Sequence, residues 1–178
     1  RFAHLLGYET NIIVDEECVV KEYDEISDEF WKRIREITLF LSEKGLGPHV
    51  IKISEHPDVS FYSIEYEKVI PLSIDEDDDN TKYILSKYSK EEIRSKITII
   101  VDELHGLGYG HGDLHIGNIG YIDKDEKFVI LDHDTMYKIS EGLVDWLKMW
   151  MKEGFVWEAT LEEFVDHDYD QWCSDWLC

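Results

Sequence analysis

The sequence predicts an α+β fold built in two parts. Residues 1–66 alternate short segments rich in β-branched and aromatic residues with one long amphipathic helical pattern. Residues 67–178 are dominated by helical spacing of apolar residues, interrupted by a strand hairpin. Hydrophobic residues make up 43% of the 178 residues and there are only 3 prolines, which excludes a disordered acidic chain. We therefore expect a five-stranded antiparallel sheet with one helix, followed by a reduced, mainly helical part.

Strands open the first part. Each predicted strand is short and bounded by turn residues, as in an antiparallel meander. The first three are expected over residues 2–6, 11–14 and 18–23. Two further strands, over residues 50–53 and 59–64, flank a turn at residues 56–58 and complete the predicted sheet.

One helix is predicted between the third and fourth strands. Its apolar residues recur at helical spacing at Phe30, Ile34, Ile37 and Leu41. Ser27 or Asp28 is expected to cap its N-terminus, and Gly45 is expected to end it.

A second helix is predicted from a capping box formed by Ser89 and Glu92, and it is expected to end at Gly106. Its predicted buried stripe is Ile93, Ile97, Ile100, Val101 and Leu104. Two more helices are expected near the C-terminus, over residues 141–152 and from Thr160.

Charge limits the partners of the chain. The formal net charge is −22, which argues against broad contact with nucleic acid or an anionic membrane and favours a basic partner. No apolar run approaches the length that spans a membrane. The acidic residues 75–80 are expected to form a solvated loop, or else to dock a basic substrate.

The 3 cysteines show no disulfide pattern. Cys18 is expected to be a small core residue, and Cys173 and Cys178 are expected to be exposed thiols. This composition favours a reducing compartment.

Polar residues typical of phosphoryl transfer follow the second helix. Asp113 and Asn118 have the spacing Asp-x-x-x-x-Asn, and Asp132 ends a hairpin predicted over residues 119–122 and 127–131. Transfer from ATP needs one carboxylate to orient the attacking hydroxyl. It also needs an amide oxygen and a second carboxylate to hold Mg²⁺ against the phosphates. The spacing therefore indicates a kinase that uses ATP and Mg²⁺.

The loop sequence HGDLHIGN and the order of the elements resemble the protein-kinase-like superfamily, most closely its atypical and small-molecule members. The resemblance implies a bilobal protein-kinase-like fold, with residues 1–66 as the small lobe and residues 67–178 as a reduced large lobe. It also implies that Asp113 is the catalytic carboxylate, and that Asn118 and Asp132 are the magnesium ligands.

In the first part, Lys21 ends a run that resembles the Val-Ala-Ile-Lys strand of kinases. Strand alternation places Val19 and Lys21 on one face, where they would provide an apolar contact for adenine and a cation for phosphate. The alternative is an ordinary lysine at a sheet edge. The resemblance makes Glu36 the expected ion-pair partner of Lys21, and Glu29 and Glu43 are the other candidates.

The resemblance also assigns the rest of a nucleotide site. Ile64, Glu65 and Glu67 resemble the gatekeeper and hinge, where backbone groups would bind adenine, and Gly7 is the one glycine of the phosphate-binding loop. His111 is expected to brace the catalytic loop. His115 is expected to touch substrate or phosphate.

A different interpretation of the same region is a His–Asp cluster of the phosphohydrolase kind. Its members would be His111, Asp113, His133 and Asp134. Such clusters lie on helices, whereas these residues flank strands, so the kinase interpretation is favoured.

The chain departs from standard kinases in several ways. Only one loop glycine remains, Asp132-His133-Asp134 replaces Asp-Phe-Gly, no Ala-Pro-Glu follows, and His115 occupies the usual place of a lysine. These losses indicate a minimal atypical kinase of viral or effector type.

We expect an ATP-dependent phosphotransferase that modifies serine or threonine of a protein substrate, with a basic substrate favoured. The alternatives are a small-molecule phosphotransferase of the aminoglycoside or choline type, and a catalytically weak pseudokinase that acts as an interaction module. The expected location is the cytoplasm, or the host cytoplasm for a viral or effector protein. The sequence does not indicate an oligomeric state.

Overall fold

The computed structural model describes residues 8–141, 172–173 and 176–177. These residues form an α+β fold with antiparallel sheets, which confirms the predicted class. The chain divides into two compact units, Arg1–Val69 and Ile70–Cys178, whereas the predicted boundary lies after residue 66. The first predicted strand, over residues 2–6, lies outside the described residues.

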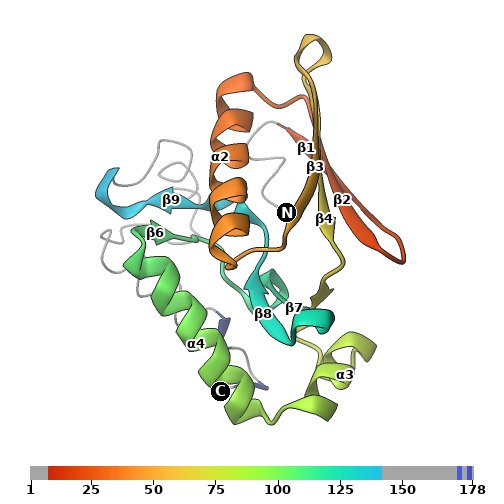
Figure 1. The fold of residues 1–178 in the computed structure, drawn as a ribbon, viewed down its shortest axis with the longest axis vertical. Coiled ribbons are helices and arrows are strands. Elements are labelled where there is room, and N and C mark those ends of the chain that lie inside the picture. Colours follow the sequence, from red (N-terminus) through yellow and green to blue (C-terminus); the bar gives the residue numbers. More distant parts are fainter. Residues whose placement is uncertain (1–7, 142–171, 174–175, 178) are drawn as a thin grey trace. The chain divides into compact units, whose positions relative to one another are not determined.

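The first unit contains a four-stranded antiparallel sheet in the order β1-β2-β4-β3 (Figure 1). Its strands are β1 (Glu9–Val14), β2 (Cys18–Asp24), β3 (Val50–His56) and β4 (Phe61–Glu67). Four of the five predicted strands are thus present. The last of them starts later than predicted because residues 57–59 form a 3-10 turn, and Ser60 then adopts a left-handed φ of 52°.

Helix α2 (Asp28–Lys44) lies alongside this sheet (Figure 1). Ser27 is its N-cap, because the Ser27 hydroxyl accepts the Phe30 N–H at 3.2 Å. Asp28 instead occupies the first turn, where its carboxylate pairs with Lys32 at 2.9 Å. Gly45 ends the helix with a φ of 72°, a conformation that glycine adopts without steric cost.

Aromatic side chains fill the space between α2 and the sheet. Trp31 stacks on Tyr62 with ring centroids 4.6 Å apart, and the Tyr23 ring centroid lies 5.5 Å from that of Trp31. The buried cluster comprises Tyr8, Tyr23, Ile26, Trp31, Ile34, Tyr62 and Ile64. Burial of large aromatic rings is the main apolar contribution to the stability of this unit.

The second unit contains two short antiparallel sheets and two of the described helices (Figure 1). Its helices are α3 (Asp79–Lys87) and α4 (Lys90–Gly106). Its strands are β5 (Ile70–Pro71), β6 (Tyr109–Gly110), β7 (Ile119–Ile122), β8 (Lys127–Ile130) and β9 (Tyr137–Lys138). One sheet has the order β5-β7-β8, and the other pairs β6 with β9.

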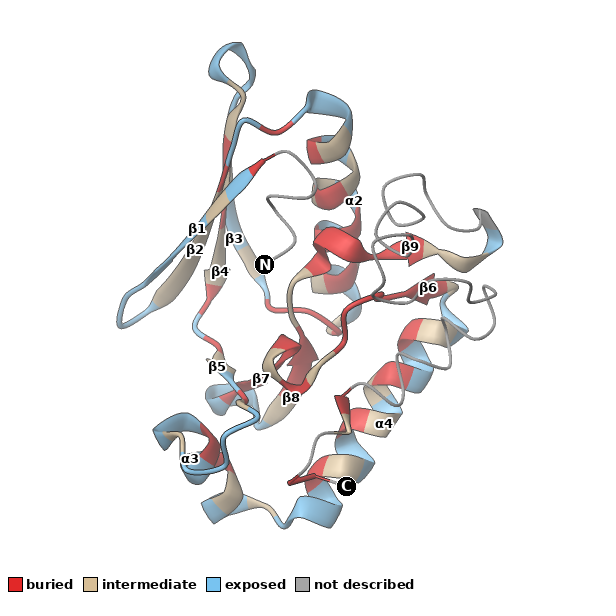
Figure 2. Ribbon diagram, turned by 180° about the vertical axis from the view of Figure 1, so that it is seen from behind, coloured by how far each residue is buried: buried red, intermediate tan, exposed pale blue. Residues whose placement is uncertain are grey.

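The hairpin of β7 and β8 confirms the predicted strand pair, and most of its residues are buried (Figure 2). Both expected helices beyond residue 141 lie largely outside the described residues. None of the described helices has the length and apolar character needed to cross a membrane.

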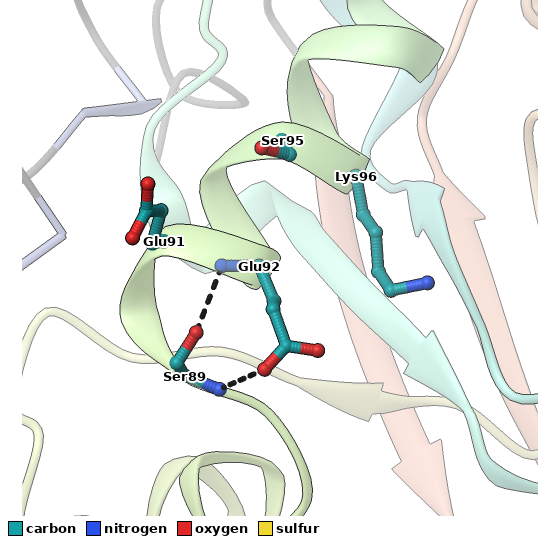
Figure 3. Close-up of a pocket in the computed structure, with 5 residues that line it drawn as sticks. All are labelled: Ser89, Glu91, Glu92, Ser95 and Lys96. Atoms are coloured by element: carbon teal, nitrogen blue, oxygen red, sulfur yellow. Dashed lines mark hydrogen bonds between the residues drawn. The ribbon is translucent and has the colours of Figure 1, made fainter.

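Helix α4 begins at the predicted capping box. The Ser89 hydroxyl accepts the Glu92 N–H at 3.1 Å, and the Glu92 carboxylate accepts the Ser89 N–H at 3.2 Å (Figure 3). The predicted stripe is buried at Ile93, Ile97, Val101 and Leu104. Ile100 is only half-buried, so its predicted burial is wrong. A shallow hollow of about 310 Å³ beside the first turns of α4 is lined by Ser89, Glu91, Glu92, Ser95 and Lys96.

The acidic segment is only partly the predicted loop. Asp79 starts α3, and Asp78 caps that helix by accepting the Thr81 N–H at 3.2 Å. Glu76 pairs with Lys90 at 2.9 Å. Several of these carboxylates therefore have local structural partners.

The cysteines also differ from expectation. Cys18 is a half-buried free thiol, whereas Cys173 is disulfide-bonded. The predicted free thiol at Cys173 is therefore wrong, because spacing alone does not reveal a pairing made by tertiary structure.

Replacing Ser89 with alanine should lower the free energy of unfolding by about 1 kcal/mol, because the Glu92 N–H loses its acceptor. Urea denaturation measures this change. Ser95→Ala is the matched control, since Ser95 is exposed in the same helix, and its effect should stay within about 0.5 kcal/mol. Equal stability of the two variants would contradict the capping role.

Candidate functional site

The loop that carries the predicted catalytic residues runs from β6 to β7 in the second unit. It starts beside Gly110, where an added Cβ would lie 2.3 Å from the Tyr137 Cζ atom, so only glycine fits. Gly112 then takes a left-handed φ of 87°. Gly110 therefore allows the Tyr137 ring to approach closely, and Gly112 allows the chain to turn before Asp113.

His111 connects this loop to the segment that follows β8. Its Nδ1 atom accepts the Asp113 N–H at 3.1 Å, and its Nε2 atom lies 2.8 Å from the Leu131 carbonyl oxygen. Because Nδ1 accepts, the hydrogen of the neutral ring is on Nε2 and is donated to Leu131. The Thr135 hydroxyl donates to the His111 carbonyl at 2.8 Å. His111 is completely buried, and it braces the loop that carries Asp113, as expected from the sequence.

Asn118 makes a second connection between the same segments. Its side-chain Nδ2 donates to the Asp113 carbonyl at 2.7 Å, and its own carbonyl accepts the Leu131 N–H at 2.8 Å. The amide nitrogen is thereby directed toward the loop backbone, and the amide oxygen is directed away from that carbonyl. Asp113 and Asn118 are 2% and 8% exposed.

Asp132 follows Leu131 directly and adopts a left-handed conformation with φ 55°. This conformation is uncommon for a residue with a Cβ, and it turns the chain out of β8. A 3-10 turn follows over residues 133–135, and the His133 ring bonds the Ile130 carbonyl at 2.8 Å. The backbone of Asp132 is therefore held next to Leu131, to which both His111 and Asn118 are bonded.

Asn118 and Asp132 carry the oxygen-bearing side chains that Mg²⁺ prefers, and their role as metal ligands stays a prediction. This ion takes oxygen ligands and commonly uses one or two protein groups together with substrate phosphates. Within the part of the chain that the structure describes, no group of three or more His, Cys, Asp or Glu side chains could hold a metal ion. The alternative His–Asp cluster has no support there, because the rings of His111 and His133 bond backbone carbonyls.

His115 lies at the start of a 3-10 turn over residues 116–118. Its Nδ1 atom accepts the Gly117 N–H at 3.1 Å. Its Nε2 atom lies 3.8 Å from Asp113 Oδ2, and its side chain is 36% exposed. The sequence suggested a substrate contact for His115, but its role as a cap and its proximity to Asp113 were not predicted.

In the first unit, Lys21 lies on the side of the sheet that faces α2. The partner of Lys21 in the register is Ile64, which is completely buried in the cluster beneath α2. The Lys21 ammonium lies 5.0 Å from the centre of the Tyr23 ring. Val19 shares this face by strand alternation and is half-buried.

The other predicted nucleotide-site residues have mixed positions. Glu36 is exposed on α2. Glu65 lies in β4, which is paired on both sides, and the Glu67 N–H donates to the His49 carbonyl at 2.9 Å. Gly7 lies outside the described residues. The ion pair of Lys21 with Glu36 and the adenine contacts at Ile64, Glu65 and Glu67 stay predictions.

The turn between β1 and β2 contacts Cys18, the first residue of the predicted nucleotide strand β2. The Cys18 thiol donates to Asp15 Oδ2 at 3.2 Å, and Asp15 Oδ1 accepts the Glu17 and Cys18 N–H groups at 2.8 Å each. The hydrogen bond to the Asp15 carboxylate raises the pKa of Cys18 to about 11. The backbone N–H groups, Cys18 first, lower the pKa of Asp15.

No known protein-family model matches the chain, and no curated protein matches its sequence.

Replacing His111 with alanine should lower the free energy of unfolding by on the order of 3 kcal/mol, because two buried backbone groups lose their partner. Urea denaturation measures the loss. His49→Ala is the control, because His49 is exposed and its backbone bonds survive the change. A His111 variant as stable as the His49 variant would show that the bridge contributes nothing.

Replacing Asp15 with asparagine should lower the pKa of Cys18, which the carboxylate holds at about 11. Because the thiolate is the reacting form, alkylation by iodoacetamide at pH 8 should be faster by on the order of 10-fold. Mass spectrometry of the peptide that contains Cys18 gives the rate. Asp24→Asn is the control, because Asp24 is exposed on the same strand as Cys18, and it should leave the rate of Cys18 alkylation unchanged.

Proposed function

We propose that this protein transfers the γ-phosphoryl group of ATP to serine or threonine of a protein. The observation that carries the proposal is the double connection of the Asp113 loop to Leu131, through the His111 ring and through Asn118. This connection holds Asp113, Asn118 and Leu131, the residue before Asp132, in one hydrogen-bonded unit. Phosphoryl transfer depends mainly on such positioning, because the protein does little covalent chemistry itself.

Each residue has a role in this proposal. Asp113 accepts the proton of the substrate hydroxyl. At the same time the hydroxyl oxygen bonds to the γ-phosphorus, and the bond between that phosphorus and the ADP oxygen breaks. Asn118 and Asp132 would hold Mg²⁺, which neutralises charge on the phosphates when it is bound. Lys21 would bind the phosphates as a local cation, which a chain of net charge −22 requires for an anionic nucleotide.

The charge of the chain also supports the proposed substrate class. Excess negative charge attracts basic segments and repels nucleic acid and anionic membranes. A basic protein is therefore the acceptor to test first. A viral or effector-type, cytoplasmic kinase remains part of the proposal because Asp132-His133-Asp134 replaces the Asp-Phe-Gly motif of regulated kinases.

Asp113→Ala should lower kcat for phosphoryl transfer by about 10²- to 10⁴-fold, because the group that accepts the hydroxyl proton is lost. ATP binding, measured by calorimetry with Mg²⁺, should persist. Asp125→Ala is the matched control, since Asp125 is exposed in the turn between β7 and β8. Full activity in the Asp113 variant would remove this residue from the mechanism.

The same assay identifies the acceptor. Purified protein is incubated with Mg²⁺ and labelled ATP, in parallel with a basic protein, an aminoglycoside and choline. Label on the basic protein supports the proposal. Label only on a small molecule would indicate a small-molecule phosphotransferase, and ATP binding without transfer to any acceptor would indicate a pseudokinase.

A further inference from the structure

The imidazole of His115 is held in one orientation by its own loop. Its Nδ1 atom accepts the Gly117 N–H at 3.1 Å, which makes the side chain the cap of the 3-10 turn. A Cβ on residue 117 would lie 2.9 Å from His115 Cε1 and 3.0 Å from Nδ1. Contacts this short force the ring to move, so the observed orientation depends on glycine at position 117.

This hydrogen bond also determines where the ring hydrogen lies. Because Nδ1 accepts a hydrogen bond, the neutral imidazole carries its hydrogen on Nε2. That atom is 3.8 Å from Asp113 Oδ2. The distance is too long for a hydrogen bond but short enough for electrostatic attraction between an N–H dipole and a carboxylate.

Asp113 benefits from such support because its side chain is only 2% exposed. A carboxylate removed from water is stabilised when polar groups are directed toward it. His111 and Asn118 hold the backbone of Asp113. The His115 ring is a polar group that the structure places beside Oδ2.

We propose that His115 is a positioning residue for phosphoryl transfer, which acts by holding Asp113 Oδ2 so that Oδ1 accepts the proton of the substrate hydroxyl. Gly117 is the second part of this device, because it leaves room for the ring. The inference rests on the proposed function. It adds that the His115 ring, clamped by the catalytic loop itself, sets the orientation of the catalytic carboxylate.

Two substitutions separate the cap from the donor. His115→Asn keeps an oxygen acceptor near the position of Nδ1 and so keeps the cap, but it lacks a donor at the position of Nε2. His115→Gln keeps the donor, since its amide nitrogen reaches the position of Nε2, but it loses the cap at the position of Nδ1. We expect His115→Asn to lower kcat by on the order of 10- to 100-fold, the effect of misplacing a catalytic group by about 1 Å, with the KM for ATP little changed.

We expect His115→Gln to recover most of that kcat while its melting temperature falls by about 2–4 °C, because the cap is lost. A purely structural role predicts the reverse order of the two variants in kcat. Equal losses in both variants, or no loss in His115→Asn, would overturn the proposal.

Gly117→Ala gives an independent test of the clamp. It should lower kcat in the wild-type background, because the added methyl group displaces the His115 ring. It should have little further effect on kcat in His115→Asn, where the donor at the position of Nε2 is already absent, so the two changes should be strongly non-additive. Additive losses would overturn the clamp.

Nitrogen NMR of ¹⁵N-histidine-labelled protein at neutral pH tests the ring without any activity. The resonances of His115, assigned from their absence in His115→Asn, should show the tautomer with hydrogen on Nε2. Hydrogen on Nδ1 would overturn the inference. A wild-type protein that transfers no phosphoryl group would overturn the proposed function and this role with it, whereas an active wild type with an unaffected His115→Asn variant would overturn the role of His115 alone.

Discussion

The candidate site depends on the two hydrogen bonds that the buried His111 imidazole makes with backbone groups. One ring binds the Asp113 N–H and the Leu131 carbonyl, two backbone groups that are far apart in the sequence and shielded from water. An unpaired group of this kind costs about 1–3 kcal/mol, so the ring strongly favours the arrangement in which both loops meet. Asn118 and Thr135 add hydrogen bonds between the same segments. The predicted catalytic and metal-binding loops are therefore one rigid unit.

The apolar core explains how this polar unit is supported. Every residue of β7 is buried, and β8 is buried except at its first residue. Ile93, Ile97, Val101 and Leu104 of α4 are equally buried. Close packing of such elements resists small displacements, so side chains of the connecting loop are held at defined positions. The histidine rings satisfy carbonyls at the end of β8 that the strand pairing leaves available.

Negative charge serves local structure as well as any partner. Asp15 organises the turn between β1 and β2, and Asp78 caps α3. Asp123 accepts the Tyr83 hydroxyl at 2.7 Å, and this hydrogen bond, together with Lys87, lowers the pKa of Asp123. Several of the carboxylates that contribute to the net charge of −22 thus also make hydrogen bonds or ion pairs within the chain. Most exposed ion pairs of this kind contribute less than about 1 kcal/mol.

Local patterns in the sequence were sufficient to predict α2, α4 and the hairpin of β7 and β8. Some signals involve only residues close together in the sequence, so they can be predicted without tertiary contacts. They are the capping box at Ser89, the helical stripe of α4 and the glycine that ends α2. The short helix α3 was missed because its apolar positions are few, although Asp78 followed by Thr81 is a capping signal. The delayed start of β4 depends on a turn with positive φ at Ser60, which residue type alone does not indicate.

The sequence by itself determined the α+β class, the main helices and strands, and the residue types that point to phosphoryl transfer. Only the tertiary structure decided that the His111 ring bonds both the Asp113 N–H and the Leu131 carbonyl, that Asn118 binds the Asp113 backbone, and that His115 caps its own turn beside Asp113. The reason is physical. Periodicity and capping are local properties of the chain, whereas the role of a polar side chain is set by the donors and acceptors that folding brings within about 3 Å of it.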